Sequence, residues 1–191
     1  MAVDRRKQIV EAASQSFALF GYKATTMDQV AKLANVGKGT IYTFFSNKEE
    51  LFDEIMSGLI REVRQIADAE YDEYQPFFDN LSRVLRRILD YRDKHQLAVK
   101  MAHEVRDMGT AKALEGLQKL EAAILSYIQA RIQVAVDKGQ LKHCNPEVTA
   151  FVMLKLYVAL ASDWQQFHEA LPKEKIAELF ELYLLHGLAA E

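Results

Sequence analysis

The chain's most suggestive chemistry lies in residues 38–43, where polar side chains share one side of a predicted short helix. At about 100° per residue, Ile41, Phe44 and Phe45 cluster on the opposite, apolar side. A lysine can bind guanine edges, hydroxyls can bind phosphates or bases, and a glycine permits close approach. We therefore expect this helix to enter the major groove of double-stranded DNA, with a contact face formed by Lys38, Gly39, Thr40, Tyr42 and Thr43.

The residues before this helix predict a second short helix and a tight turn. Thr26 can cap that helix, and Gln29 stands three residues later, as in a capping box. Asn35 suits the left-handed residue that ends a helix, and Gly37 opens the next one. Together they predict a helix-turn-helix, in which we expect Thr26 to contact a DNA phosphate.

A long helix is expected directly after the motif. Asn47 can cap it, with Glu50 completing another capping box. Lys48 in its first turn is unfavourable for the helix dipole but well placed to meet a phosphate. We expect this helix, residues 48–70, to connect a DNA-binding domain, residues 1–47, to a second domain, residues 48–191.

These residues resemble the N-terminal domain of the TetR family of bacterial regulators. The resemblance covers about the first fifty residues and rests on Thr26, Val30-Ala31, Ala34-Asn35-Val36-Gly37, Gly39-Thr40, Tyr42, Phe45 and Lys48-Glu49-Glu50-Leu51. Asn35 replaces the usual glycine of the turn and Gly37 the usual capping serine. The resemblance implies a ligand-responsive transcriptional regulator, expected to be a repressor. The alternative for the motif itself is a helical hairpin in an ordinary bundle.

Composition favours an all-α protein. Half of the residues are hydrophobic, and the chain has only 8 glycines and 3 prolines, which favours long helices. We expect about nine, at residues 4–20, 26–34, 37–44, 47–70, 76–94, 97–108 and 111–138, then one starting at Pro146 and one after Pro172. Gly21 is expected to follow the end of the first helix.

Charge and cysteine content bound the setting. Residues 1–50 carry a net charge of +2 and residues 51–191 a net charge of −5, as expected for a mildly basic DNA reader attached to an acidic body. The single cysteine, Cys144, excludes an intramolecular disulfide and fits a reducing compartment. We expect a cytoplasmic protein without a membrane segment.

The last two helices are apolar around more of their circumference than one core can cover. Such helices must be buried on more than one side. We therefore expect a homodimer, and the resemblance implies a four-helix bundle of these helices and their symmetry mates, reading a palindromic operator. The expected interface residues are Phe151, Leu154, Val158, Leu179, Phe180 and Tyr183.

The resemblance also implies an inducer pocket in the second domain. The stretch LAVKMAHEVRDM resembles the fatty-acyl-CoA-responsive branch of the family, which implies a small hydrophobic or amphipathic inducer, fatty acid or acyl-CoA-like. An arginine could bind its acidic group. The alternatives are that Arg106 pairs with Glu104 or Asp107 on the surface, and that the aromatic residues are core. The candidate ligand-binding residues are His103, Arg106, Tyr127, Arg131, Tyr157 and Trp164.

No catalytic, metal or cofactor motif stands out. His103 and Asp107 are one turn apart but lack a third ligand, and His143-Cys144 has no nucleophile motif around it. We therefore expect no catalytic residues, no metal and no cofactor. The main alternative function is a small-molecule-binding helical protein without operator-specific DNA binding, and an enzyme is a second alternative.

Overall fold

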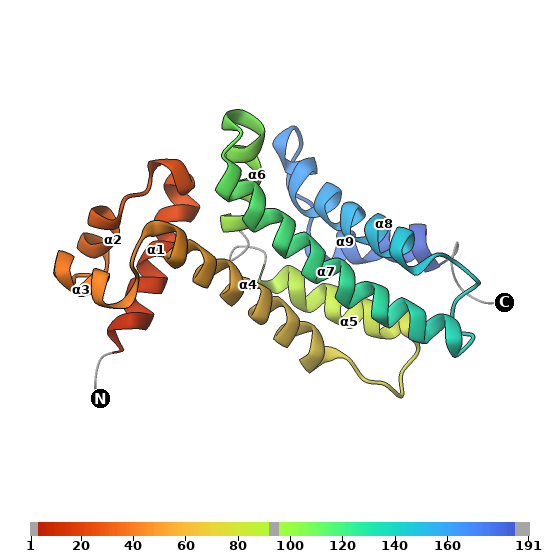
Figure 1. Cartoon of the computed structure of the whole chain (residues 1–191). Coiled ribbons are helices and arrows are strands. Elements are labelled where there is room, and N and C mark those ends of the chain that lie inside the picture. The colour runs from red at the N-terminus through yellow and green to blue at the C-terminus, as the bar shows by residue number, and fades with distance from the viewer. Residues whose placement is uncertain (1–3, 92–95, 186–191) are drawn as a thin grey trace. The chain divides into compact units, whose positions relative to one another are not determined.

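The regular elements of the protein are helical in the part that the computed structural model describes, residues 4–91 and 96–185 (Figure 1). Within these ranges there are nine α-helices and no β-strand. The side chains of Gln96 and Arg106 lie outside the description. The α-helices are α1 (Arg5–Ala24), α2 (Met27–Leu33), α3 (Lys38–Phe44), α4 (Lys48–Glu70), α5 (Phe77–Asp90), α6 (Gln96–Met108), α7 (Ala111–Asp137), α8 (Pro146–Val158) and α9 (Lys173–Phe180).

The chain divides into two compact units. Unit 1 comprises Met1–Arg61 and Lys94–Leu120, and unit 2 comprises Glu62–Asp93 and Glu121–Glu191. Helices α4 and α7 each contribute to both units. The division therefore differs from the boundary expected at residue 48, because α6 packs against α1 and so belongs with the helix-turn-helix.

Helix α1 contains a break at Gly21, where the sequence predicted the end of the helix. Asp4 caps it by accepting a hydrogen bond from the Lys7 amide at 3.1 Å. Gly21 has φ 86°, and the chain then resumes a helical turn to Ala24 instead of ending at Phe20. A left-handed residue at this position favours glycine. The Thr25 hydroxyl donates to the Gly21 carbonyl at 2.9 Å and secures the turn.

The predicted helix-turn-helix is confirmed. Thr26 and Gln29 form the expected capping box on α2. Asn35 is left-handed, with φ 51°, and the two amides that follow the helix bond back to Lys32 and Ala31, at 3.1 and 3.0 Å. This pairing satisfies carbonyls at the helix end. Gly37 begins α3 without a side-chain cap, as expected.

Buried side chains of α1, α3 and α4 form the core of unit 1, and several of them are aromatic. The rings of Phe17 and Phe52 meet edge to face with centroids 5.4 Å apart, and Tyr22 lies 4.9 Å from Phe52. Ile41 and Phe45 are also fully buried. Such ring pairs contribute roughly 0.5–1.5 kcal/mol each beyond the area that they bury. The burial of Ile41 and Phe45 leaves the polar side of α3 outward.

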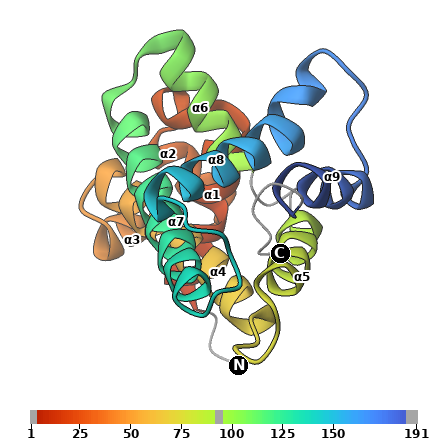
Figure 2. The same ribbon diagram turned by 90° about the vertical axis from the view of Figure 1, so that its right-hand side faces the viewer.

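Unit 2 has its own core, formed by α5, the second part of α7, α8 and α9. Its buried residues include Phe77, Leu85, Ile132, Met153 and Ile176. Helices α5 and α9 lie side by side (Figures 1 and 2).

Buried Asn80 fixes the loop before α5. It accepts a hydrogen bond from the Asp72 amide at 2.8 Å and donates to the Asp72 and Gln75 carbonyls. The α4–α5 loop is therefore held by one side chain of α5.

Several helix ends differ from expectation. Helix α5 ends at Asp90 rather than near Lys94, which lies outside the described residues. Helix α8 gives way to a π-helical turn, η2 (Ala159–Asp163), and a 3₁₀ turn, η3 (Trp164–Gln166), and α9 continues as a π-helical segment, η4 (Glu181–Leu185).

The cap of α4 also differs. The Asn47 side chain accepts a hydrogen bond from the Glu50 amide, as predicted. The Glu50 carboxylate, however, accepts a hydrogen bond from the Ser46 amide and not from the Asn47 amide.

Candidate nucleic-acid interface

The predicted DNA-contacting face of α3 is exposed. Tyr42 is 46% exposed, and Lys38, Gly39 and Thr43 are also on the surface, whereas Ile41 is fully buried. Thr40 is half-buried. The expected apolar side is wrong at Phe44, whose side chain is exposed. The α3 surface therefore presents a cation, hydroxyls and an open glycine, for which an added Cβ meets nothing within 4 Å.

Two of the hydroxyls are already engaged by their own helices. The Thr43 hydroxyl donates to the Thr40 carbonyl at 2.7 Å. The Thr26 hydroxyl accepts from the Gln29 amide at 3.3 Å and donates to the Gln29 side-chain oxygen at 3.1 Å. A hydroxyl has one proton to donate but can accept more than one hydrogen bond. Thr43 therefore stays a predicted contact as an acceptor, and the predicted phosphate contact of Thr26 requires its proton to turn away from Gln29.

Lys38 has a partner that the sequence did not indicate. Its ammonium lies 2.9 Å from a carboxylate oxygen of Asp28, in the first turn of α2. This hydrogen bond raises the pKa of Lys38. The residues are ten apart, and no local pattern in the sequence pairs them.

Lys48 makes contacts within unit 1 in addition to its predicted phosphate contact. Its ammonium donates to the Tyr22 carbonyl at 2.9 Å and to the Thr25 carbonyl at 3.0 Å, and it lies 4.3 Å from the centroid of the Tyr22 ring. An ammonium has three donors, so a phosphate contact needs the third. Lys48 therefore joins the start of α4 to the turn between α1 and α2.

Tyr22 is fixed from its other end as well. Its hydroxyl donates to a Glu49 carboxylate oxygen at 2.8 Å. Burial of the ring and this hydrogen bond raise the pKa of Tyr22. Two adjacent residues in the first turn of α4, Lys48 and Glu49, thus bind Tyr22. These contacts fix the start of α4 against the helix-turn-helix.

Comparison with known proteins agrees with this geometry. Residues 9–55 match the family described as bacterial regulatory proteins, tetR family. The HTH-type transcriptional regulator YhgD of Bacillus subtilis (strain 168) is 55% identical over 190 residues, which cover 100% of both chains. The chain belongs to the TetR family. It is a DNA-binding transcriptional regulator and not an enzyme.

Solved structures share the fold of this TetR-family regulator. A fatty acid metabolism regulator of Clostridium perfringens has a TM-score of 0.79 at 19% identity, covering 96% of this chain and 100% of that one. SmeT in complex with triclosan has a TM-score of 0.83 at 18% identity, covering 98% of this chain and 92% of that one.

Two of the candidate ligand residues of the regulator lie together in unit 2. The Arg131 guanidinium is 3.2 Å from an Asp68 carboxylate oxygen and lies 4.0 Å from the centroid of the Tyr71 ring. The Tyr127 hydroxyl donates to the same Asp68 oxygen at 2.8 Å. Burial of the Tyr127 ring raises its pKa, and the hydrogen bond to Asp68 adds to the effect. Arg131 is therefore already neutralised by a carboxylate.

The other candidates lie on α6, α8 and η3. His103 lies half-buried on α6 in unit 1, and the Arg106 side chain lies outside the described residues. Tyr157 packs against the unit 2 core. Trp164 is exposed, donates to the Glu169 carbonyl at 3.1 Å and stacks on His168. Among the candidates, Tyr127 and Arg131 are joined through one carboxylate, that of Asp68.

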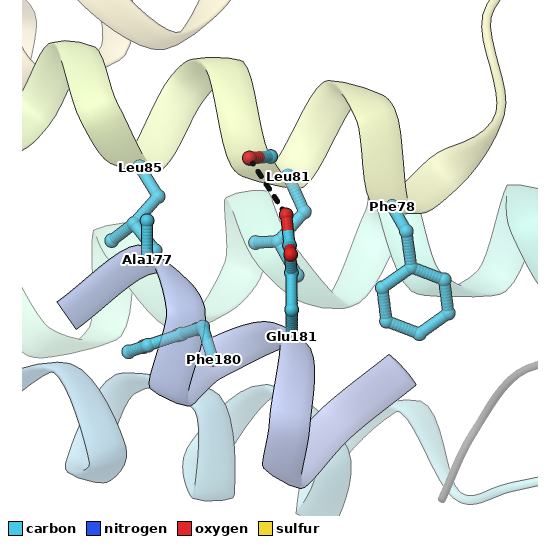
Figure 3. Close-up of a pocket in the computed structure, with 7 residues that line it drawn as sticks. Phe78, Leu81, Leu85, Ala177, Phe180 and Glu181 are labelled. Atoms are coloured by element: carbon cyan, nitrogen blue, oxygen red, sulfur yellow. Dashed lines mark hydrogen bonds between the residues drawn. The ribbon is translucent and has the colours of Figure 1, made fainter. Parts of the chain in front are cut away.

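Hollows within unit 2 differ in size and character. Between α5 and the α9–η4 segment there is an apolar pocket of about 10 Å³ (Figure 3), no more than one water molecule needs. It is lined by Phe78, Leu81, Ser82, Leu85, Ala177, Phe180 and Glu181.

An open depression of about 400 Å³ adjoins Arg131. It is lined by Asp68, Tyr71, Asp72, Glu73 and Arg131. Its size falls in the range of ligand sites, but its three carboxylates oppose an acidic ligand.

The predicted dimer residues separate into three groups by exposure. Phe151 and Tyr183 are 47% and 58% exposed, and Leu154, Val158 and Leu179 are half-buried. Phe180 corrects the prediction, because it is only 4% exposed and belongs to the chain's own core. Three further apolar residues on these elements are exposed, namely Val148, Val152 and Leu182.

Among the described residues, no cluster of three or more His, Cys, Asp or Glu side chains is arranged to hold a metal ion. No helix in the same ranges has the length and apolar content needed to cross a membrane.

Proposed function

We propose that the protein is a cytoplasmic, homodimeric repressor that binds a palindromic operator and is released by a small hydrophobic or amphipathic inducer. The observation that carries the DNA-binding part is the exposed polar face of α3, held outward by the burial of Ile41 and Phe45. Its predicted base contacts are Lys38, Gly39, Thr40, Tyr42 and Thr43, and its predicted phosphate contacts are Thr26 and Lys48.

The dimer is supported by apolar surface on the last helices. Phe151 and Val152 on α8 and Leu182 and Tyr183 on η4 are all about half exposed. Exposed apolar side chains at consecutive positions, as in each of these two pairs, indicate an interaction site. A twofold dimer would pair these helices with their copies and present two α3 helices to one operator.

Inducer control is supported by the direct attachment of α6 to α1. The buried Glu104 side chain of α6, 5% exposed, accepts a hydrogen bond from the Lys23 amide at 2.9 Å. A Cβ at Gly21 would lie 2.3 Å from the other carboxylate oxygen. Since α6 bears His103 and Arg106, a ligand that moves α6 would displace the turn before α2. Helix α4, which runs continuously from Lys48 into unit 2, offers a second route.

The inducer class is supported by a structural neighbour described as a fatty acid metabolism regulator and by another in complex with triclosan. Fatty acids and triclosan, the molecules that these descriptions mention, are hydrophobic or amphipathic. We propose a fatty acid or acyl-CoA-like inducer for this chain.

Selection of bound duplexes from a random pool tests the DNA-binding part. We expect enrichment of an inverted repeat with half-sites about one helical turn apart, roughly 10 bp or a multiple of it. A pool that shows no enrichment, with only salt-sensitive binding to every sequence, would leave the alternative of a small-molecule-binding protein.

The inducer class is tested by repeating the selection with palmitate, palmitoyl-CoA or coenzyme A alone. We expect palmitoyl-CoA or palmitate to release the operator and to raise the melting temperature of the free protein, and coenzyme A alone to do neither. Absence of both effects with either acyl compound would remove the proposed inducer class without affecting the operator assignment.

A further inference from the structure

An ion pair joins the two helices of the helix-turn-helix on its outer surface. The Lys38 ammonium at the start of α3 lies 2.9 Å from the Asp28 carboxylate in the first turn of α2. Both side chains are exposed, so the pair meets whatever approaches the polar face of α3.

The local charge makes this carboxylate unusual for a DNA reader. Between Thr26 and Phe45 the sequence has three charged residues, Asp28, Lys32 and Lys38. Asp28 cancels half of the positive charge that this segment would otherwise offer to a polyanion. A carboxylate at this position repels phosphates and weakens the sequence-independent part of DNA binding.

Helix stability explains only part of the placement of Asp28. An acid in the first turn of a helix is favoured by the helix dipole, and this would account for Asp28 on α2 alone. It does not account for the bond to a lysine on a different helix, ten residues along the chain. The hydrogen bond also raises the pKa of Lys38, so the carboxylate stabilises the charged form of that side chain.

We propose that Asp28 is a specificity-determining residue of the regulator. Its carboxylate holds the Lys38 ammonium, and DNA must offer a better partner to take it. Guanine presents two acceptors, N7 and O6, on one edge in the major groove. A non-operator duplex offers the phosphates, which Asp28 repels, without that edge correctly placed. Asp28 therefore weakens binding to non-operator DNA more than it weakens binding to the operator. This inference rests on the proposed operator contacts of α3.

The test uses Asp28→Asn, which keeps the side-chain shape and removes the charge. Dissociation constants are measured for the selected operator and for a scrambled duplex of equal length over a salt series. We expect the scrambled duplex to bind about three- to tenfold more tightly at low salt, with a salt slope steeper by about 0.9, as for one further phosphate contact. The operator affinity should change less, so the ratio of the two affinities falls.

Asp79→Asn is the matched control. Asp79 is also an exposed aspartate in the first turn of an α-helix, α5 in unit 2. Its substitution changes net charge and helix dipole by the same amount, and it lies outside the helix-turn-helix. We expect equal, small changes for both duplexes.

A double-mutant cycle connects the effect to Lys38. With Lys38→Met in place, Asp28→Asn should no longer lower the affinity ratio. The proposal is overturned if Asp28→Asn changes that ratio no more than Asp79→Asn does, or changes it equally with and without Lys38. A wild-type protein that selects no operator would instead overturn the proposed function, and thermal melts identify any variant that fails to fold.

Discussion

Lys38, the first residue of α3, and Lys48, the first residue of α4, differ in their contacts. The Lys38 ammonium pairs with the solvent-exposed carboxylate of Asp28, and a DNA base can replace that partner. Lys48 is bound to two main-chain carbonyls and a tyrosine ring. We infer that Lys38 contributes to sequence reading and that Lys48 contributes to both stability and phosphate binding.

Substitution separates these roles. Lys38→Ala should relax sequence preference and leave thermal stability nearly unchanged, because surface ion pairs contribute only about 0–1 kcal/mol. Lys48→Ala should destabilise unit 1 by about 1–3 kcal/mol through the lost hydrogen bonds and ring contact, and should weaken all DNA sites alike. Urea unfolding and binding to the operator and a scrambled duplex measure both quantities. An equal loss of specificity from the two substitutions would contradict this division.

Glu54 should make unit 1 sensitive to acid. The hydrogen bond from Arg6, 3.1 Å away, and the charge of Arg61 hold the pKa of Glu54 below its ordinary value of 4.5. A lowered folded-state pKa contributes stability above the unfolded pKa, and this stability is lost as pH falls through the folded value. Glu54→Gln should therefore cost about 0.5–1 kcal/mol at pH 7, allowing for solvent screening, and less below pH 4.

Urea unfolding at several pH values tests this dependence. Glu11→Gln is the control, since the Glu11 carboxylate has a longer contact, 3.9 Å to Lys7 in its own helix. A cost of Glu54→Gln that stays constant between neutral and acid pH would exclude the ion pair as its cause.

At the scale of helices, a glycine sets how closely α4 and α7 pack within unit 1. A Cβ at Gly116 would lie 2.8 Å from the buried Phe52 ring and 3.3 Å from Met56. Phe52 is fully buried and cannot move away without disturbing the aromatic core. The crossing of these two helices therefore depends on the absence of a side chain at one position.

Gly116→Ala should destabilise the protein by about 1–3 kcal/mol from overpacking, opposed by about 1 kcal/mol of improved helix propensity. Gly58→Ala is the matched control, because its nearest atom would be an Arg61 nitrogen at 3.9 Å, and propensity alone should stabilise α4. Thermal melts of both variants decide the sign. Stabilisation by both substitutions would show that α4 and α7 can separate at no cost.

At the scale of the whole molecule, the exposed apolar residues of α8 and η4 predict assembly. Phe151→Asp should convert the dimer to a monomer, since it would bury an unpaired charge at the proposed interface. Tyr74→Asp, at an aromatic residue that is 87% exposed in the α4–α5 loop, should leave the dimer intact. Analytical ultracentrifugation at micromolar concentration measures both. A wild-type chain that sediments as a monomer would contradict the interface.

Loss of the dimer should weaken binding to the operator. A monomer presents one α3, and so contacts one half-site rather than two. Phe151→Asp should therefore weaken operator binding far more than binding of an isolated half-site.

The sequence by itself determined the elements whose partners lie a few residues away. Thr26 and Gln29 form the α2 capping box, Asn35 is left-handed in the turn, and α8 begins at Pro146. Such hydrogen bonds depend on local geometry, and the residue types announce them. The apolar periodicity likewise placed nine helices, although their ends shifted where α8 and α9 pass into π-helical turns.

Only the tertiary structure decided the contacts between residues far apart. Asp28 forms an ion pair with Lys38, and Asp68 forms one with Arg131. Glu104 accepts a hydrogen bond from the amide of Lys23, 81 residues away. Each is a pair of common charged or polar groups whose types fit many partners. Which partner is reached depends on how helices pack, and packing is set by the buried aromatic and aliphatic side chains of the whole unit.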